Sequence, residues 1–118
     1  MTSTLKVEDL GHFTGSETLW RHVLRPNMFY TDGVKYVAQA GEAYWLLDVI
    51  ISAQMLRRVK REEFQVWGFK VDGQSGVIVA DNGNGKEFFI QEIPFTDFPL
   101  PEIKFYVTNN VVMLPSEY

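Results

Sequence analysis

The strongest constraint on the fold is an apolar segment in the middle of the chain, residues 42–58. On a helical wheel one broad face holds Trp45, Leu46, Val49, Ile50, Ala53 and Leu56, and much of another holds Tyr44, Leu47, Ile51 and Met55. A helix that is apolar on nearly all sides is buried on more than one side. We therefore predict a central helix over residues 42–58, with a sheet on one flank and earlier helices on another.

The periodicity of the sequence changes after this segment. Residues 14–59 follow a helical pattern, whereas residues 62–114 read as short strands joined by tight turns. Helices followed by strands, without alternating βαβ units, indicate an α+β fold. The length of 118 residues is that of one ordinary domain. We expect residues 1–118 to form one α+β domain in which N-terminal helices pack on a C-terminal antiparallel sheet of about five strands.

Two helices are predicted before the central one. The run Thr14-Gly-Ser-Glu17 fits a capping box, and Arg25-Pro26 would end the helix, because the residue before a proline is disfavoured in helical geometry. Its apolar stripe would consist of Leu19, Trp20, Val23 and Leu24. A second helix is expected to open at Thr31 or Asp32, since either side chain can cap a helix, and to end or kink at Gly41.

Five strands are predicted in the C-terminal half, at residues 63–71, 77–80, 87–93, 103–108 and 111–114. The connections at 72–76 and 81–85 are rich in residues that tolerate positive φ, and Asn109-Asn110 fits a two-residue hairpin turn. The run at 81–87 also resembles a phosphate or calcium loop. Ala80 and Gly83 occupy positions where those patterns need a glycine and an oxygen ligand, so a hairpin turn is the better interpretation.

Composition and charge exclude several classes of protein. The absence of cysteine rules out disulfides, thiolate nucleophiles and cysteine-based metal sites. A net charge of −4 argues against general nucleic-acid binding, which needs a basic surface. The start of the chain does not resemble a signal peptide, and its longest apolar run is too short to span a bilayer. We expect a soluble cytoplasmic protein with no cofactor, no metal site and no membrane association.

The two histidines are the first candidates for chemistry. His12 and His22 are ten residues apart, which is not the spacing of a common metal-ligand pair. Either imidazole could act as a general base, since histidine titrates near neutral pH. The simpler interpretation is that each is a capping or surface side chain.

Asp48 is the second candidate, because it interrupts the apolar central segment and has Ser52 one turn further on. A carboxylate in such surroundings is desolvated, paired with a cation, or exposed on a narrow polar stripe. The first two situations occur at active sites more often than elsewhere. The third requires no function.

One basic cluster is present, formed by Arg57, Arg58, Lys60 and Arg61. At the end of the central helix these charges would complement the helix dipole. The cluster is therefore either a contact for nucleic acid or an acidic partner, or a solvated helix end.

Aromatic residues make up 14% of the chain, and the helical half contains Trp20, Phe29, Tyr30, Tyr36, Tyr44 and Trp45. If several of them share a surface with Thr31 and Asp32, they would form a ligand pocket or the centre of a protein interface. The alternative is that they pack in the core.

Several motifs, taken in order, resemble those of a family of uncharacterised small bacterial proteins. They are Phe13-Thr-Gly-Ser-Glu17, Tyr30-Thr-Asp-Gly33, Ala43-Tyr-Trp-Leu-Leu-Asp48, Gln91-Glu-Ile-Pro-Phe-Thr-Asp-Phe-Pro99 and Leu114-Pro-Ser-Glu-Tyr118. The resemblance spans nearly the whole chain and implies a complete protein, but it implies no activity and no catalytic role. It singles out the candidates that lie in or beside the motifs, namely Trp20, His22, Tyr30, Asp32, Trp45 and Asp48.

Three hypotheses follow for the function. The first is a non-enzymatic binding or regulatory protein that acts through a protein partner or as a homodimer. The second is a small enzyme that uses Asp48 or Asp32 with a histidine. The third is a nucleic-acid-associated protein that uses residues 57–61 together with Trp67 or nearby aromatic residues. We favour the first, because the sequence contains no catalytic signature.

Overall fold

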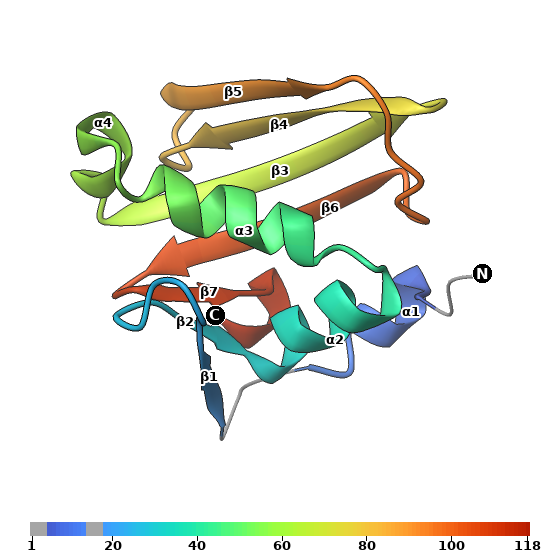
Figure 1. Ribbon diagram of the computed structural model, residues 1–118, viewed down its shortest axis with the longest axis horizontal. Helices are drawn as coiled ribbons and strands as arrows, with labels where there is room; N and C mark the ends of the chain where they lie inside the picture. The colour runs from blue at the N-terminus through green and yellow to red at the C-terminus, as the bar shows by residue number, and fades with distance from the viewer. Residues whose placement is uncertain (1–4, 14–17) are drawn as a thin grey trace.

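The computed structural model describes residues 5–13 and 18–118, and it shows an α+β fold as predicted (Figure 1). The elements in chain order are α1 (Val7–Leu10), β1 (Leu19–Arg21), β2 (Phe29–Thr31), α2 (Asp32–Ala40), α3 (Tyr44–Ala53), α4 (Arg57–Lys60), β3 (Phe64–Asp72), β4 (Ser75–Asp81), β5 (Glu87–Ile93), β6 (Glu102–Thr108), β7 (Val111–Met113) and a 3-10 turn η1 (Pro115–Glu117).

The described strands form one sheet in the order β1-β2-β7-β6-β3-β4-β5. All five predicted C-terminal strands are present, as β3 to β7. The predicted count of five is nevertheless wrong, because β1 and β2 from the N-terminal half extend the sheet to seven strands. The sheet is also not purely antiparallel, since β2 pairs with β7 in parallel. The turn predicted at Asn109-Asn110 is confirmed, and both residues have positive φ.

The helix predicted over residues 14–24 is wrong wherever the structure describes it. Leu19–Arg21 is a strand that pairs antiparallel with β2, and a loop follows it. The residues read as a buried stripe instead face outward, and Val23 is 89% exposed. Tertiary pairing with β2 therefore overrides the local helical pattern. The capping box at Thr14–Glu17 lies outside the described residues.

Helix α2 begins as predicted. Thr31 is its N-cap, and the Thr31 hydroxyl accepts a hydrogen bond from the Val34 amide at 3.3 Å. The helix ends at the predicted Gly41. Glu42 then adopts a φ of 52°, which separates α2 from α3.

Helix α3 is buried on more than one side, as predicted, through Leu46, Leu47, Ile50, Ile51 and Ala53. It ends at Ala53, however, and not at residue 58. The Gln54 side chain donates hydrogen bonds to the Ile50 carbonyl and to Gln65, which fixes a turn there. The short helix α4 follows, and Met55, predicted to be apolar and buried, is 72% exposed. No helix in the described part of the chain is long and apolar enough to cross a membrane.

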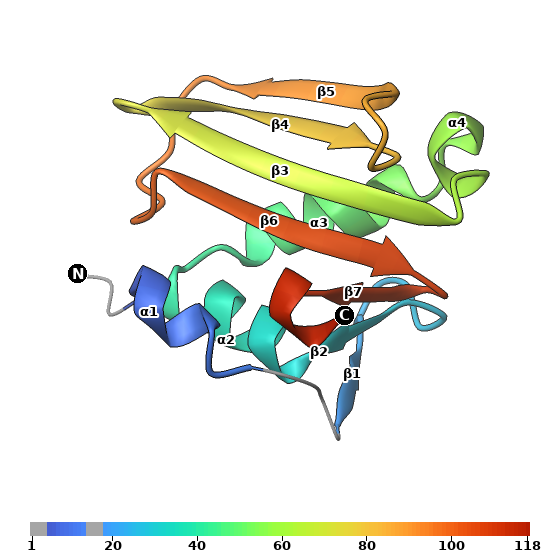
Figure 2. The same ribbon diagram turned by 180° about the vertical axis from the view of Figure 1, so that it is seen from behind.

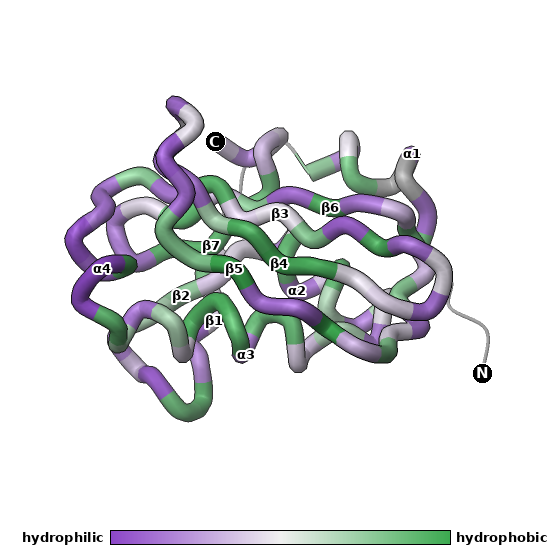
Figure 3. The backbone as a smooth tube through the Cα atoms, turned by 90° about the horizontal axis from the view of Figure 1, so that it is seen from above, coloured by the Kyte–Doolittle hydropathy of each residue, from purple (hydrophilic) through white to green (hydrophobic). Residues whose placement is uncertain are grey.

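The hydrophobic core lies between α3 and the sheet. Trp67, Phe69, Ile78 and Phe105 are buried on the face of the sheet that α3 covers (Figure 1). The ring of Trp45 contacts that of Phe69 edge to face, with centroids 5.4 Å apart. Coloured by hydropathy, α3 is mostly hydrophobic and α4 mostly hydrophilic (Figure 3). Burial of this apolar surface is the dominant favourable contribution to folding.

The other face of the sheet has no helix across β3, β4 and β6 in the region the structure describes (Figure 2). Three aromatic rings gather there. Phe64 contacts Tyr106 and Tyr118 at centroid distances of 5.1 and 5.3 Å, and the two tyrosines lie 5.5 Å apart. The last residue is thus held against β3 and β6.

Glu117 joins the end of the chain to the start of α2. Its carboxylate accepts hydrogen bonds from the Thr31 hydroxyl at 2.6 Å, the Gly33 amide at 3.1 Å and the Leu114 amide at 2.9 Å. The carboxylate therefore satisfies a free N–H at the positive end of the helix. A Cβ on Gly33 would lie 2.6 Å from the Glu117 carboxylate, so a side chain at this position would displace the carboxylate from its contacts.

We predict that Glu117→Gln lowers the free energy of unfolding by about 1 kcal/mol, because a charge-assisted contact at a helix N-terminus becomes a neutral one. Urea unfolding measures the change. Glu92→Gln, at an exposed position on β5, is the control and should leave stability unchanged. Equal stability of wild type and Glu117→Gln would contradict the role assigned to this carboxylate.

Candidate functional site

Two of the predicted site residues meet where β1 faces the start of α2. The Trp20 indole nitrogen donates a hydrogen bond of 2.8 Å to Asp32 Oδ1. The Lys35 ammonium lies 3.1 Å from the centre of the Trp20 ring, a cation–π contact. Trp20 is thus held flat against α2 with one side open to solvent.

Two further candidates, His22 and Asp48, are in direct contact. His22 Nε2 lies 2.8 Å from Asp48 Oδ1, and the two side chains are 7% and 53% exposed. His22 Nδ1 accepts hydrogen bonds from the backbone amides of Leu24 at 3.3 Å and Arg25 at 3.2 Å. Because Nδ1 faces two donors, the proton of the neutral ring resides on Nε2 and is donated to Asp48.

This contact decides what the histidine can do. Both ring nitrogens of His22 are occupied, and the ring is buried, so neither nitrogen faces a cleft where it could exchange a proton with a substrate. The imidazole instead ties the loop after β1 to the exposed side of α3. Asp48 is accordingly both paired with the histidine and half exposed.

Tyr30 lies beside this pair, in the strand next to β1, where it is paired with Trp20. Burial raises the pKa of the Tyr30 phenol, and the nearby Tyr44 and Asp48 raise it further. The phenol is therefore neutral over the physiological range. Four elements, β1, β2, α2 and α3, bring Trp20, His22, Tyr30, Asp32 and Asp48 into one region of the molecule.

The remaining candidates lie elsewhere. Trp45 packs against Phe69 on the sheet, and His12 is exposed after α1. Arg57, Arg58, Lys60 and Arg61 are exposed on and just after α4. Arg58 is engaged, because its Nε donates to the Phe88 carbonyl at 3.0 Å. Arg61 lies 3.8 Å from Glu62.

Exposed apolar side chains occur on the segments that the His22–Asp48 contact joins. They belong to β1, to the loop after it, to the start of α3 and to the turn that follows α3. We call this set the loop patch, and it consists of Trp20, Val23, Leu24, Tyr44 and Met55. Tyr44, Asp48 and Ser52 follow one another at four-residue spacing, so they form one stripe along α3. The two members of the loop patch on the loop, Val23 and Leu24, are held in place by the His22 ring.

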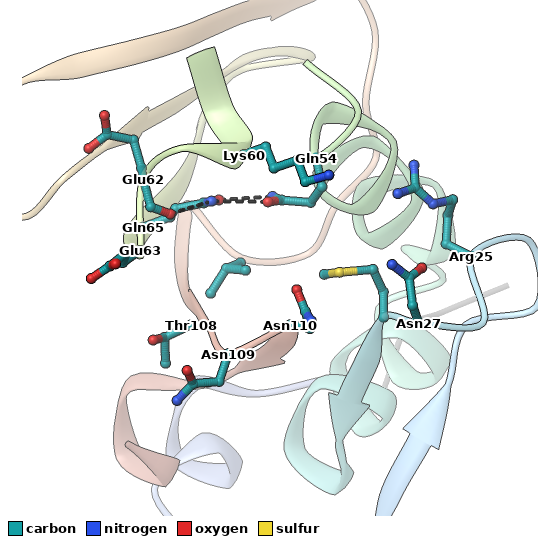
Figure 4. Close-up of a pocket in the computed structure, with 12 residues that line it drawn as sticks. Arg25, Asn27, Gln54, Lys60, Glu62, Glu63, Gln65, Thr108, Asn109 and Asn110 are labelled. Atoms are coloured by element: carbon teal, nitrogen blue, oxygen red, sulfur yellow. Dashed lines mark hydrogen bonds between the residues drawn. The ribbon is translucent and has the colours of Figure 1, made fainter. Parts of the chain in front are cut away.

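A polar pocket of about 410 Å³ was not predicted from the sequence (Figure 4). Its wall includes a buried pair of amides, Gln54 and Gln65, which exchange hydrogen bonds of 2.8 and 3.0 Å. Gln65 also accepts from the Trp67 indole at 2.8 Å. The available signal was a glutamine at an inward position of a strand, because buried amides need partners. Nothing in the sequence indicated that Arg25 and Asn110 would meet there.

We predict that His22→Ala raises the hydrogen-exchange rates of the Leu24 and Arg25 amides, because both lose their acceptor. Asp48→Asn is the matched variant. It removes the charge but leaves Nδ1 in place, so these two amides should keep most of their protection. Unchanged exchange in His22→Ala would show that the ring does not organise the loop.

We also predict a stability loss at high pH that depends on Tyr30. The folded-state pKa lies above the ordinary value of 10.0, so the stabilisation from the neutral phenol is complete below pH 10.0 and is lost as the pH rises through the folded pKa. Urea unfolding between neutral and strongly alkaline pH measures this loss. It should be shallower in Tyr30→Phe, and an identical pH profile would contradict the assignment.

Comparison with known proteins places the chain in a family. No curated protein and no solved structure matches it. A family model described as a family of unknown function, DUF6876, matches residues 4–118, which confirms the expected membership of an uncharacterised family. The chain therefore belongs to this family of unknown function, DUF6876.

Proposed function

We propose that this protein is a non-enzymatic binding protein that acts through protein–protein contact, with either a different protein or a second copy of the chain. The observation that supports this proposal most is the ordered loop after β1, which exposes two large apolar side chains. Val23 and Leu24 are 89% and 77% exposed. Both side chains are far more exposed than the apolar side chains of the hydrophobic core.

The loop is held by contacts at both ends, so its conformation is set before any partner binds. The His22 amide donates to the Met28 carbonyl at 3.0 Å, and the Met28 amide donates to the Arg25 carbonyl at 2.8 Å. The His22 side chain adds its contact to Asp48. A loop ordered in advance loses little conformational entropy on binding, which favours affinity.

The composition of the loop patch also suits an interface. Trp20, Tyr44 and Met55 supply aromatic and thioether surface, which is enriched where proteins meet. The half-exposed Asp48 provides a polar group beside the loop, which it contacts through His22. An apolar surface rimmed by polar residues marks interaction sites on folded proteins.

The enzyme alternative has less support. It requires Asp48 or Asp32 beside a histidine in a cleft, with one ring nitrogen directed at a substrate. His22 meets the first condition, but its two nitrogens bind Asp48 and the loop backbone. Asp32 accepts its described hydrogen bond from Trp20.

The nucleic-acid alternative loses the one aromatic residue that was named for it. Trp67 is 1% exposed and its indole donates to Gln65. Arg58 and Arg61 of the basic cluster contact the Phe88 carbonyl and Glu62.

Pairing through a sheet edge also has less support than the loop patch. The pairing of the edge strand β5 with β4 has a register irregularity at Ala80/Asp81. Strand β5 also carries the exposed charges of Glu87 and Glu92, and Arg58 covers its Phe88 carbonyl. Such features protect an edge from pairing with another strand. The opposite edge, β1, is only three residues long.

We predict that Leu24→Asp abolishes protein association while changing the free energy of unfolding by no more than about 0.5 kcal/mol, because the side chain is exposed. Sedimentation velocity over about a hundredfold range of protein concentration detects a second copy. A photo-crosslinking residue at position 24, introduced in the cells that make the protein, detects a different partner.

Phe95→Asp is the matched control, because Phe95 is 68% exposed and lies outside the loop patch. Association or a defined adduct that depends on position 24 but not on position 95 supports the proposal. A chain that is monomeric throughout and gives no adduct at position 24 above that at position 95 would refute it.

A further inference from the structure

The polar pocket lies where five segments of the chain meet. The loop after β1 contributes Arg25, Asn27 and Met28, and the turn between β6 and β7 contributes Asn109 and Asn110 (Figure 4). The end of α3, the end of α4 and the start of β3 complete the wall. The volume of about 410 Å³ is in the range of small-molecule sites, about 300–1,000 Å³.

Arg25 has an unmet requirement in this wall. Its Nη1 is buried and has no hydrogen-bond partner among residues 5–13 and 18–118. A buried, unpaired guanidinium N–H is unfavourable, because it has lost its hydration without gaining an acceptor. The backbone of Arg25 is fixed at the same time, since its amide donates to His22 and its carbonyl accepts from Met28. The backbone of Arg25 is thus held by a rigid loop, and the residue lines the pocket.

The charges around the pocket favour an anion. Lys60 supplies a second cation to the wall. Of the two acidic residues, Glu62 lies 3.8 Å from Arg61 and 3.7 Å from Lys86, and the carboxylates of Glu62 and Glu63 point away from the cavity in Figure 4. The side chains of Arg25 and Lys60 therefore share the pocket wall with neutral amides, whereas the carboxylates of Glu62 and Glu63 do not face the cavity.

The neutral part of the wall is rigid. Gln54 and Gln65 are bonded to each other and to backbone carbonyls, so they form a fixed surface. Asn27 and Asn110 add further amide groups to the wall, and Met28 and Val107 add apolar surface. A small anion with a compact organic body matches this combination.

We propose that this pocket binds a small carboxylate- or phosphate-bearing metabolite, with the Arg25 guanidinium as its principal contact and Lys60 as the second. A guanidinium pairs with either group through two parallel hydrogen bonds. Because Nη1 is buried, the Arg25 side chain must shift to present this atom to the ligand. The site is separate from the loop patch and does not rest on the proposed protein binding.

The test compares wild type with Arg25→Met, using inorganic phosphate and succinate as probes at constant ionic strength. Thermal unfolding and the side-chain amide signals of Asn27 and Asn110 in ¹⁵N–¹H spectra are the readouts. Wild type should show a saturable rise in Tm and shifts of these signals. Arg25→Met should bind about 10- to 100-fold more weakly, the loss expected for one charge-assisted contact.

Arg25→Met should also fold without loss of Tm in the absence of anion, because it removes an unpaired buried group and keeps an apolar stem of similar length. Arg57→Met, at an exposed position on α4 outside the pocket, is the charge-matched control and should respond like wild type. A response to one probe alone assigns the class of ligand. No response in wild type, or an equal response in Arg25→Met, would overturn the proposal.

Discussion

The burial of α3 between the sheet and α2 is the constraint on which the rest of the structure depends. The helix buries Leu46, Leu47, Ile50 and Ile51 in two directions, which leaves one narrow stripe open to solvent. Asp48 is the charged residue on that stripe, so it is the place where a neighbouring loop can be attached by a hydrogen bond. His22 makes that attachment, and the position of Val23 and Leu24 follows from it. The candidate interface is therefore a consequence of how the central helix is buried.

Polar contacts then fix the segments that hydrophobic burial leaves undetermined. Glu117 connects the last residues to the N-terminus of α2, and Gly33 leaves room for its carboxylate. The hydrogen bonds of Gln54, one of them to Gln65, fix the turn at the end of α3, from which the chain continues toward β3. These contacts also explain why separate motifs of the sequence belong together, since the one at residues 30–33 touches the one at 114–118.

Much of the fold could be predicted from the sequence, because its signals were local. The five C-terminal strands, the cap at Thr31 and the turn at Asn109-Asn110 depend on alternation and turn chemistry within a few residues. The helix expected over residues 14–24 failed because β1 is stabilised by pairing with β2, a contact that periodicity cannot reveal. The length of α3 was overestimated because the side-chain bonds of Gln54 depend on Gln65 in a later strand.

The candidate site, too, could be predicted where its signals were local and not where distant segments come together. Asp48 stood out because a carboxylate in an apolar helix needs an explanation, and the structure provides one in His22. Of the six singled-out residues, Trp20 contacts Asp32, His22 contacts Asp48 and Tyr30 lies near Asp48, while Trp45 packs against the sheet instead. The polar pocket escaped prediction, because its amides and its arginine come from segments far apart in the chain and none is unusual where it stands.

The state of the His22 ring tests most directly whether this side chain attaches the loop to α3. The contacts require that the neutral imidazole carries its proton on Nε2, toward Asp48, and leaves Nδ1 bare to accept the loop amides. Long-range ¹⁵N–¹H spectra of the folded protein, recorded at a pH where the ring is neutral, distinguish the two nitrogens. A protonated Nε2 with an unprotonated Nδ1 is the predicted result. A ring protonated on Nδ1, or one that averages between both forms, would contradict this attachment.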